Sequence, residues 1–423
     1  MLRLREIYYL IYLLSLQLFS QTLGDVTIYN STNSNLPYNQ INCVEFDVDG
    51  KLWVGTENGL TIFDENNNEW INFNQNNPIW NLPTNSIKSL AKTPQQEMFV
   101  GTTAGITKVS WSNGITNSEW DVNSTWEANY GADCNPANNT LIKALLYMNS
   151  LWVGSTDGLC VEGLGPEGSW LIENTQNNFF SNNITSIREN STNNMIGIGT
   201  MNGGLVTYDG VFTNYYSSNS PILDNTILDL AFDQNNNIII CTPQAGLGVL
   251  TSTGSWVWFN YVNSTIPTNS LTNVVVDNNN DLWITTLEDG LLHYQNNTFY
   301  HYTSENSNLP DNNINCLQFG PNNHLWLGTE NSGLVKITTP LLSNDLGVTK
   351  NIKLYPTFVK THLHLEVIEP TIVKILNTRG DVIENLEIKK GINLLSMGKY
   401  PSGLYLISAT SSGGNITTQI IKK

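Results

Sequence analysis

Hydrophobic and polar positions alternate in short blocks through residues 25–340, and one block recurs along the chain. Residues 52–60 read Leu-Trp-Val-Gly-Thr-Glu-Asn-Gly-Leu, and close copies stand at 151–159 and 325–334. Weaker copies lie between them. The motif glycines are Gly59, Gly105, Gly158, Gly204, Gly246, Gly290 and Gly333. Their spacing of 42 to 53 residues is typical of a repeat that holds four short strands.

Each repeat predicts four strands. The first begins at an Asn-x-Ile or Asn-x-Leu marker, as at residues 39–41, and a polar turn such as Asp49-Gly50 follows it. The second strand is the Leu-Trp-Val-Gly-Thr run, the third starts at Leu60, and the fourth is aromatic, as in residues 70–73. Short runs rich in β-branched and aromatic residues, separated by Asn and Gly, favour antiparallel strands.

The two ends of the repeat region indicate how it closes. The seventh repeat has no fourth strand after residues 335–337, but residues 28–37 match residues 301–310 of the sixth repeat. The N-terminal strand is therefore expected to complete the last sheet, which removes the exposed edges of an open array. The fold predicted is all-β, a seven-bladed β-propeller closed by this strand and followed by a small C-terminal Ig-like β-sandwich.

Charge divides the chain into two parts. The net charge is -17, and residues 21–340 hold 7 Lys and Arg against 29 Asp and Glu, whereas residues 341–423 hold 10 against 6. An acidic body of this kind disfavours binding to nucleic acids and to anionic membrane surfaces. The composition otherwise fits a packed globular protein, with 40% hydrophobic residues and 12 Trp.

Residues 1–20 have the layout of a signal peptide, with Arg3 and Arg5 before an apolar run that is too short for a comfortable membrane span. No other long apolar run follows, so no membrane span is expected in the mature chain. The predicted division is a signal peptide at 1–20, a propeller at 21–340, a linker at 341–346 and a C-terminal domain at 347–423.

The five cysteines form neither a CxxC motif nor a His/Cys cluster, so a zinc site is not expected and disulfides are not expected to staple the fold. Cys43 and Cys316 occupy the same register in adjacent repeats, and two buried thiols are favoured over a bridge between them.

The motifs quoted above resemble two-component regulator propeller repeats over residues 25–340. The repeats depart from the pattern at Gly197, where Trp is usual, and at Ile239 and Cys241. This family often forms the sensing part of two-component receptors, which implies a ligand-binding module.

The C-terminal part resembles the sorting domain of type IX secretion cargo. The resemblance rests on Leu-Tyr-Pro at 354–356, Pro-Ser-Gly-Leu-Tyr-Leu-Ile at 401–407 and the Ile-Ile-Lys-Lys end. It implies export through the type IX machinery, contacted by residues 347–423, to the extracellular space or the outer-membrane surface, and then removal of the tail.

Residues that recur in register are interpreted first as structural. Trp53, Trp152, Trp283 and Trp326 are expected to form the core between sheets. The hydroxyl at the end of the second strand, Thr56 in the first repeat and Ser or Thr in all the others, is expected to form a turn hydrogen bond. The motif glycines are expected to have positive φ.

Ligand binding is instead expected on loops. In a propeller, the connections between sheets share a face with the turns between second and third strands, and one such connection is predicted to be enlarged around residues 123–138. Aromatic side chains there and acidic side chains in the neighbouring turns suggest a glycan or peptide site, although a loop that packs on its neighbours is the rival interpretation. The proposed ligand-binding residues are Trp80, Trp126, Glu127, Tyr130, Phe180, Glu57, Asp157, Glu288 and Glu330.

Catalytic signatures are lacking in the sequence: there is no Gly-x-Ser-x-Gly, no His-Glu-x-x-His and no phosphate-binding loop. No catalytic residue, metal or cofactor is assigned. The Asp-rich turns at 47–50 and 277–281 are interpreted as hairpin turns rather than calcium loops. The sequence thus predicts a secreted or cell-surface binding module for a glycan or a protein. The alternative is a polysaccharide hydrolase or lyase with carboxylates at the propeller mouth.

Overall fold

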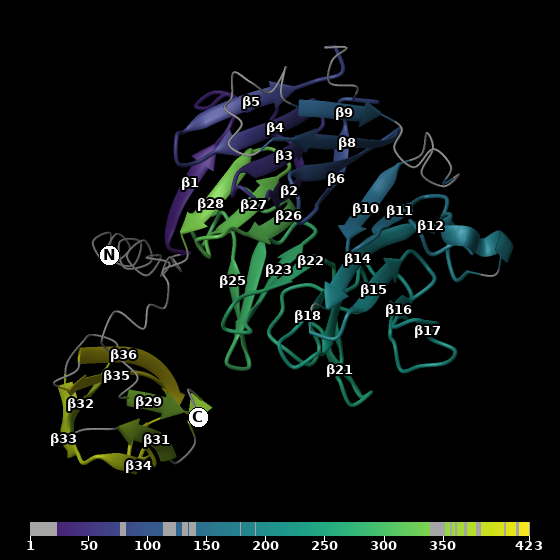
Figure 1. The fold of residues 1–423 in the computed structure, drawn as a ribbon. Coiled ribbons are helices and arrows are strands. Elements are labelled where there is room, and N and C mark those ends of the chain that lie inside the picture. Colours follow the sequence, from purple (N-terminus) through teal and green to yellow (C-terminus); the bar gives the residue numbers. More distant parts are fainter. Residues whose placement is uncertain are drawn as a thin grey trace, which may run out of the picture. The chain divides into compact units, whose positions relative to one another are not determined.

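The computed structural model describes residues 23–76, 82–112, 124–128, 134, 141–177, 179–190, 192–338, 352–355, 358–359, 362–367, 370–377, 382–401, 403–411 and 414–422. The chain divides into two compact units, Met1–Thr339 and Pro340–Lys423. Both are built almost wholly of strands, which confirms the all-β class (Figure 1). Among the helices of the described residues, none is long and apolar enough to cross a membrane.

The described part of the first unit contains seven four-stranded antiparallel sheets (Figure 1). The first sheet consists of β2 (Ile41–Phe46), β3 (Leu52–Thr56), β4 (Gly59–Asp64) and β5 (Glu69–Phe73). The second consists of β6 (Ile87–Lys92), β7 (Glu97–Thr102), β8 (Gly105–Trp111) and β9 (Ser124–Ala128). The third consists of β10 (Ile142–Tyr147), β11 (Leu151–Ser155), β12 (Leu159–Val161) and β13 (Leu171–Glu173). Two short 3-10 helices, η3 (Pro166–Gly168) and η4 (Thr175–Asn177), flank β13.

The remaining sheets repeat the pattern. Their strands are β14 (Ile184–Asn190), β15 (Met195–Thr200), β16 (Leu205–Tyr208) and β17 (Phe212–Tyr215); β18 (Asp229–Phe232), β19 (Ile238–Cys241), β20 (Leu247–Leu250) and β21 (Trp256–Phe259); β22 (Leu271–Val276), β23 (Leu282–Thr286), β24 (Leu291–Gln295) and β25 (Thr298–Tyr302); β26 (Ile314–Phe319), β27 (Leu325–Thr329), β28 (Leu334–Thr338) and β1 (Asp25–Tyr29). The first strands of neighbouring sheets contact one another in the order β2, β6, β10, β14, β18, β22, β26 and back to β2.

The N-terminal strand completes the seventh sheet, as the sequence predicts. β1 pairs antiparallel with β28, with Asp25 opposite Thr338 and Tyr29 opposite Leu334. Just before it, Leu23 is buried in the core between the sixth and seventh sheets. The last sheet is therefore assembled from both ends of the first unit.

The repeated motif builds one turn in every sheet. The hydroxyl of Thr56 donates to the carbonyl oxygen of Gly59 at 2.8 Å and accepts from the backbone N–H of Asn58. The equivalent hydroxyl bonds in the other six sheets are 2.8–3.2 Å long. All seven motif glycines have φ between +80° and +137°, a region that favours glycine. The structural interpretation of both positions is confirmed.

The repeated tryptophans lie in the core, as predicted: Trp53, Trp152, Trp283 and Trp326 are between 0% and 5% exposed. The indole N–H of Trp53 donates to Asp47 at 2.9 Å, and the same carboxylate accepts backbone N–H groups within the preceding turn. In the fourth sheet Gly197 replaces Trp, because Leu230 and Phe232 of the next sheet approach its backbone and fill the space.

The enlarged connection lies elsewhere than the sequence suggested. Trp126 and Glu127 belong to β9, where they pair with Val109 and Lys108 of β8, so their placement in a loop was wrong. The connection from β9 to β10, residues 129–141, has the same 13-residue length as residues 74–86 between β5 and β6. The extra residues are instead those between β8 and β9, residues 112–123. The alternation at 124–128, with aromatic and β-branched residues, is that of a strand.

A disulfide joins Cys134 to Cys160, with 6.1 Å between their Cα atoms. The expectation that disulfides contribute little was wrong here, because the two residues meet only after the chain folds. Both are fully buried in a core shared by the second and third sheets. Cys43 and Cys316 are free thiols as predicted, but they are partly rather than fully buried.

The second unit contains two sheets. One is three-stranded, in the order β29 (Ile352–Tyr355), β31 (His362–Val367), β34 (Gly391–Ser396). The other is five-stranded, in the order β30 (Phe358–Val359), β36 (Gly414–Lys422), β35 (Gly403–Ser411), β32 (Thr371–Leu376), β33 (Val382–Ile388). Side chains from both, including Leu365, Ile375 and Ile407, share one apolar core.

Candidate binding site in the central channel

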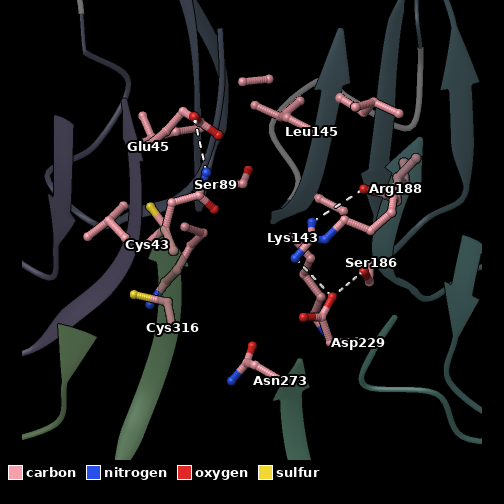
Figure 2. Close-up of a pocket in the computed structure, with 18 of the residues that line it drawn as sticks. Cys43, Glu45, Ser89, Lys143, Leu145, Ser186, Arg188, Asp229, Asn273 and Cys316 are labelled. Carbon is pink, nitrogen blue, oxygen red and sulfur yellow. Dashed lines mark hydrogen bonds and ion pairs between the residues drawn. The ribbon is translucent and has the colours of Figure 1, made fainter. Parts of the chain in front are cut away.

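A cavity of about 470 Å³ lies among the innermost strands of the first unit (Figure 2). Every sheet contributes to its lining. One contributor from each sheet in turn is Asn42, Lys88, Lys143, Thr185, Asp229, Asn273 and Asn315. We call this cavity the channel. Its volume is within the range of small-ligand sites, roughly 300–1,000 Å³.

Basic side chains are concentrated in the channel. Residues 21–340 contain only seven Lys and Arg, and four of them line it: Lys88, Lys92, Lys143 and Arg188. They come from the adjacent strands β6, β10 and β14. The lining carboxylates are Glu45, Glu189 and Asp229. The channel therefore differs in charge from the acidic body around it.

Two of the basic residues form ion pairs inside the channel. Lys92 lies 3.2 Å from Glu45, and Arg188 lies 2.9 Å from Asp229. Asp229 also accepts from the Ser186 hydroxyl at 2.6 Å. Burial raises the pKa of Glu45 above its ordinary value, although Lys92 opposes the shift. These carboxylates are held by partners, an arrangement that supports structural pairing rather than acid–base chemistry.

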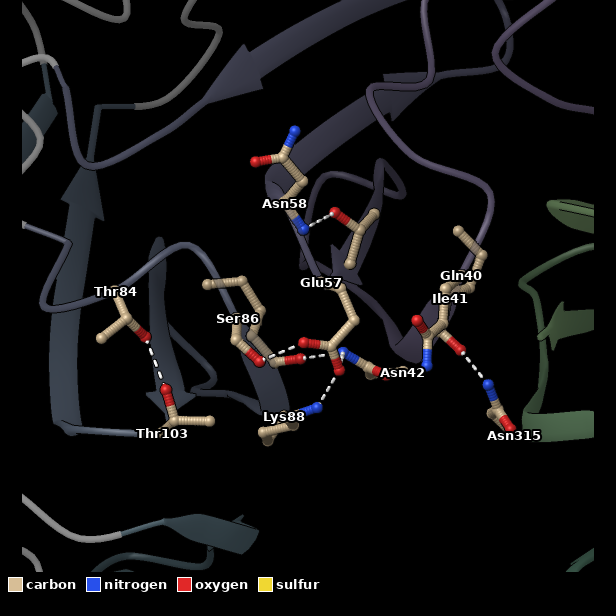
Figure 3. A network of polar contacts seen from close by, with 12 residues as sticks. Gln40, Ile41, Asn42, Glu57, Asn58, Thr84, Ser86, Lys88, Thr103 and Asn315 are labelled. Carbon is tan, nitrogen blue, oxygen red and sulfur yellow. Dashed lines mark hydrogen bonds and ion pairs between the residues drawn. The ribbon is translucent and has the colours of Figure 1, made fainter. Parts of the chain in front are cut away.

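A third basic residue is paired at the channel mouth (Figure 3). Glu57, in the turn between β3 and β4, accepts from Lys88, from the Ser86 hydroxyl at 2.6 Å and from the Asn42 amide at 3.0 Å. Burial opposes ionisation of Glu57, but these hydrogen bonds outweigh it and lower its pKa. We call this arrangement the Glu57 clasp; it fastens the first sheet to the second.

The equivalent carboxylate of the seventh sheet acts in a similar way. Glu330 accepts from the Asn315 amide at 2.8 Å and from Gln40 at 3.1 Å. The Asn315 amide also donates to the carbonyl oxygen of Ile41 on the next inner strand. Glu57 and Glu330 were predicted as ligand-binding residues, but both already have protein partners that join neighbouring sheets.

Lys143 differs from the other three basic residues. Its ammonium donates to the side-chain oxygen of Asn183 at 3.0 Å, and within the described part of the chain no carboxylate lies at ion-pair distance from it. The side chain is about half-buried, and this burial lowers its pKa. In Figure 2 it lies with Arg188 on one wall of the channel, across from Glu45.

The other predicted site residues do not gather at the channel, and the lining includes none of those that the structure describes. Asp157, Glu288 and Phe180 are exposed on turns and connections, and Glu127 is exposed on β9. Trp80, Tyr130 and the side chain of Trp126 lie outside the described residues. The channel lysines were missed, although the shared position of Lys88 and Lys143 on successive first strands is visible in the sequence.

A second cluster, Asp277, Asp281 and His293, has metal-ligating side chains within 4.8 Å of one another. Asp277 accepts the backbone N–H groups of Asn279 and Asp281, the same turn that Asp47 and Asp233 make in sheets with no such cluster among the described residues. The His293 ring stacks on Trp283 with 4.0 Å between centroids, and burial lowers its pKa. The cluster is therefore explained by the repeated turn.

Family comparisons match both parts of the chain. Residues 35–58 and 308–331 match the two-component regulator propeller, and residues 353–423 match the secretion-system C-terminal sorting domain. Both resemblances stated from the sequence are confirmed. The sorting domain indicates export to the cell surface or the extracellular space. No match was found among curated protein sequences.

Several solved structures share the fold. The extracellular domain of the hybrid two-component system BT3049 from B. thetaiotaomicron is 17% identical, with 94% of this chain and 57% of that one covered and a TM-score of 0.61. PorZ, a surface component of the type IX secretion system of Porphyromonas gingivalis, is 16% identical, with 92% and 60% covered and a TM-score of 0.54. The extracellular domain of BT4673 from B. thetaiotaomicron is 20% identical, with 85% and 47% covered and a TM-score of 0.58. The chain thus spans about half to three-fifths of the length of these proteins.

Proposed function

We propose that this chain, which carries two-component regulator propeller repeats and a type IX sorting domain, is a surface-exposed binding module whose ligand enters the channel. Its seven sheets form a closed seven-bladed propeller, and the ligand is a glycan. The observation that carries the proposal is the channel itself, a cavity of about 470 Å³ lined from every sheet by polar side chains. Sites that hold small ligands are typically concave and contain a few convergent polar groups.

The lining favours a glycan over a protein. Side chains of Asn273, Asn315, Ser89 and Thr185 line the space. Their N–H and O–H groups donate within the protein, so what they offer a ligand is their oxygens, which accept from sugar hydroxyls. A folded protein partner would need a broad surface, and a channel of this volume admits only a small group.

The C-terminal sorting domain supports a proposal for how the protein is exported and processed. We propose that residues 1–20 are a signal peptide, that 21–340 form the propeller, that 341–346 are a linker, and that 347–423 are an Ig-like sandwich recognised by the type IX machinery and then removed. Mass spectrometry of the secreted protein tests these boundaries. An exported chain that keeps residues 347–423 would contradict removal of the tail.

A channel-filling variant tests the binding proposal. Gln318 lines the channel and is partly buried, so Gln318→Trp should occlude it. Gln234 is exposed on a turn outside the channel, which makes Gln234→Trp the matched control. On a glycan array, wild type and Gln234→Trp should bind the same glycan and Gln318→Trp should not. Failure to bind any glycan, or equal binding by both variants, would overturn the proposal.

A further inference from the structure

We infer that Lys143 is an anion subsite of the channel and takes the carboxylate of an acidic saccharide. This inference rests on the proposed function, because it requires a ligand that enters the channel. It adds the chemical class of that ligand and the residue that selects it.

Lys88 and Lys143 occupy the same repeat position, one residue after Ile87 and Ile142, which begin β6 and β10. Lys88 is neutralised by Glu57, which follows Thr56 in the preceding sheet. The position equivalent to Glu57 before Lys143 is Thr103, which follows Thr102. The Thr103 hydroxyl is hydrogen-bonded to Thr84 at 2.9 Å (Figure 3). The lysine is therefore present at this position in both sheets, whereas a carboxylate is present at the position before it only for Lys88.

The missing carboxylate leaves a half-buried ammonium with a neutral amide partner. Removing a charge from water is unfavourable unless an opposite charge or good hydrogen bonds replace the water. The same cost of burying a charge lowers the pKa of Lys143 below its ordinary value. A ligand carboxylate at Lys143 would supply what Glu57 supplies to Lys88, and a hydrogen bond between two charged groups is among the strong ones.

The other charges of the channel leave this position open to an anion. Lys88, Lys92 and Arg188 are each paired with a carboxylate. Glu189, a lining carboxylate with no ion pair in the described residues, is the sixth residue of β14, whereas Lys143 is the second of β10. Four residues of strand correspond to about 13 Å, at roughly 3.3 Å per residue, so the two charges lie toward opposite mouths.

The rest of the lining favours a saccharide as the bearer of the carboxylate. Thr185, Asn273 and Asn315 line the same cavity, and with their donors bonded within the protein they offer oxygens that accept from sugar hydroxyls. A hexuronic acid joins one carboxylate to several hydroxyls within a volume that the channel admits. An acidic peptide would present carboxylates on flexible chains, with fewer groups for these amides to bind.

Calorimetric titration of the full chain tests the inference. The probes are digalacturonate, its neutral methyl ester and a short polyglutamate. Wild type should bind digalacturonate about tenfold or more tightly than the ester, since the difference is one charged hydrogen bond. Lys143→Gln should abolish this preference while it keeps the weaker binding of the ester.

Two further variants separate charge from folding. Thr103→Glu keeps the lysine but supplies the carboxylate that the repeat omits, so it should also abolish the preference. Lys108→Gln removes a base on β8 that pairs with Glu97 outside the channel lining, and it should change nothing. All variants should unfold at the wild-type temperature to within a few degrees.

The possible results of these titrations bear on the subsite and on the proposed function separately. A preference for digalacturonate that survives both Lys143→Gln and Thr103→Glu would overturn the subsite. Binding of neutral glycans with no preference for either carboxylated probe would overturn it and leave the proposed function standing. Preferential binding of polyglutamate would overturn the assignment to a saccharide. No binding of any glycan would overturn both proposals.

Discussion

Two junctions between neighbouring sheets have the same backbone turn and differ in the side chains that hold the sheets together. Between the first and second sheets, the Glu57 clasp joins Asn42, Ser86 and Lys88. Between the second and third sheets, Thr103 replaces Glu57, and the buried Cys134–Cys160 disulfide lies in the shared core instead. The covalent link is located where the carboxylate is absent, and the lysine of that junction has no acidic partner among the described residues.

The difference shows how two copies of one repeat can keep the same backbone and differ in the role of a channel lysine. The turn that carries Glu57 and the turn that carries Thr103 have the same Thr hydroxyl bond and the same positive-φ glycine. A single side chain on an unchanged backbone then decides whether a channel lysine is structural or available to a ligand.

Loss of the disulfide should have the largest effect. Cys134 and Cys160 are separated by 26 residues, and closing a loop of that length stabilises a fold by about 3.5 kcal/mol in the chain-entropy model. The Cys134→Ala/Cys160→Ala variant should lose about this free energy of unfolding in urea titrations. Reductant should destabilise wild type equally and leave the variant unchanged. A variant as stable as wild type would show that the second junction does not depend on the bridge.

Gly59→Ala should damage the turn that holds the clasp. Gly59 has φ +124°, and a Cβ there would lie 2.5 Å from the carbonyl oxygen of Phe73. A strained backbone position of this kind costs on the order of 2 kcal/mol. Gly50→Ala is the control, since Gly50 has φ +79° but nothing within 4 Å of the added carbon. Equal losses of stability for the two variants would contradict the close contact.

Glu57→Gln should weaken the first junction by about 1.5 kcal/mol, because hydrogen bonds to a charged acceptor are lost. The pKa of Glu57 lies below its ordinary value, so its ionised form stabilises the fold above that ordinary value, and the contribution is lost as pH falls through the folded pKa. The difference between wild type and Glu57→Gln should thus be full at neutral pH and shrink in acid. The control is Glu305→Gln, at an exposed position. A difference that grows in acid would contradict the clasp.

Thr103→Glu should give the smallest effect and the opposite sign. The new carboxylate would stand near Lys143 as Glu57 stands near Lys88, and a partly exposed ion pair contributes about 0.5 kcal/mol. Differential scanning calorimetry should show slightly higher stability at low salt and less gain at high salt. A destabilised variant would indicate that the two junctions are not equivalent in geometry.

The fold was largely predictable because its determinants are local and repeated. The Trp, Gly and Thr positions recur often enough that their roles in core and turn follow from pattern alone. Closure by the N-terminal strand was also predictable, since residues 28–37 match residues 301–310. Pairing of β1 with β28 confirms this inference.

The site was not predictable in the same way. Loop length favoured Trp126, which is on a strand, and the carboxylates in turns favoured Glu57 and Glu330, which join sheets. Lys88, Lys143 and Arg188 are about fifty residues apart in sequence, and only the ring of inner strands brings them to one cavity. The Cys134–Cys160 pairing likewise depends on packing between sheets.

The deciding measurement is a crystal structure of the full chain with digalacturonate bound. We expect the sugar in the channel, with a carboxylate oxygen about 3 Å from the Lys143 ammonium. A sugar bound outside the channel, or bound within it with its carboxylate directed away from Lys143, would show that Lys143 is not the anion subsite.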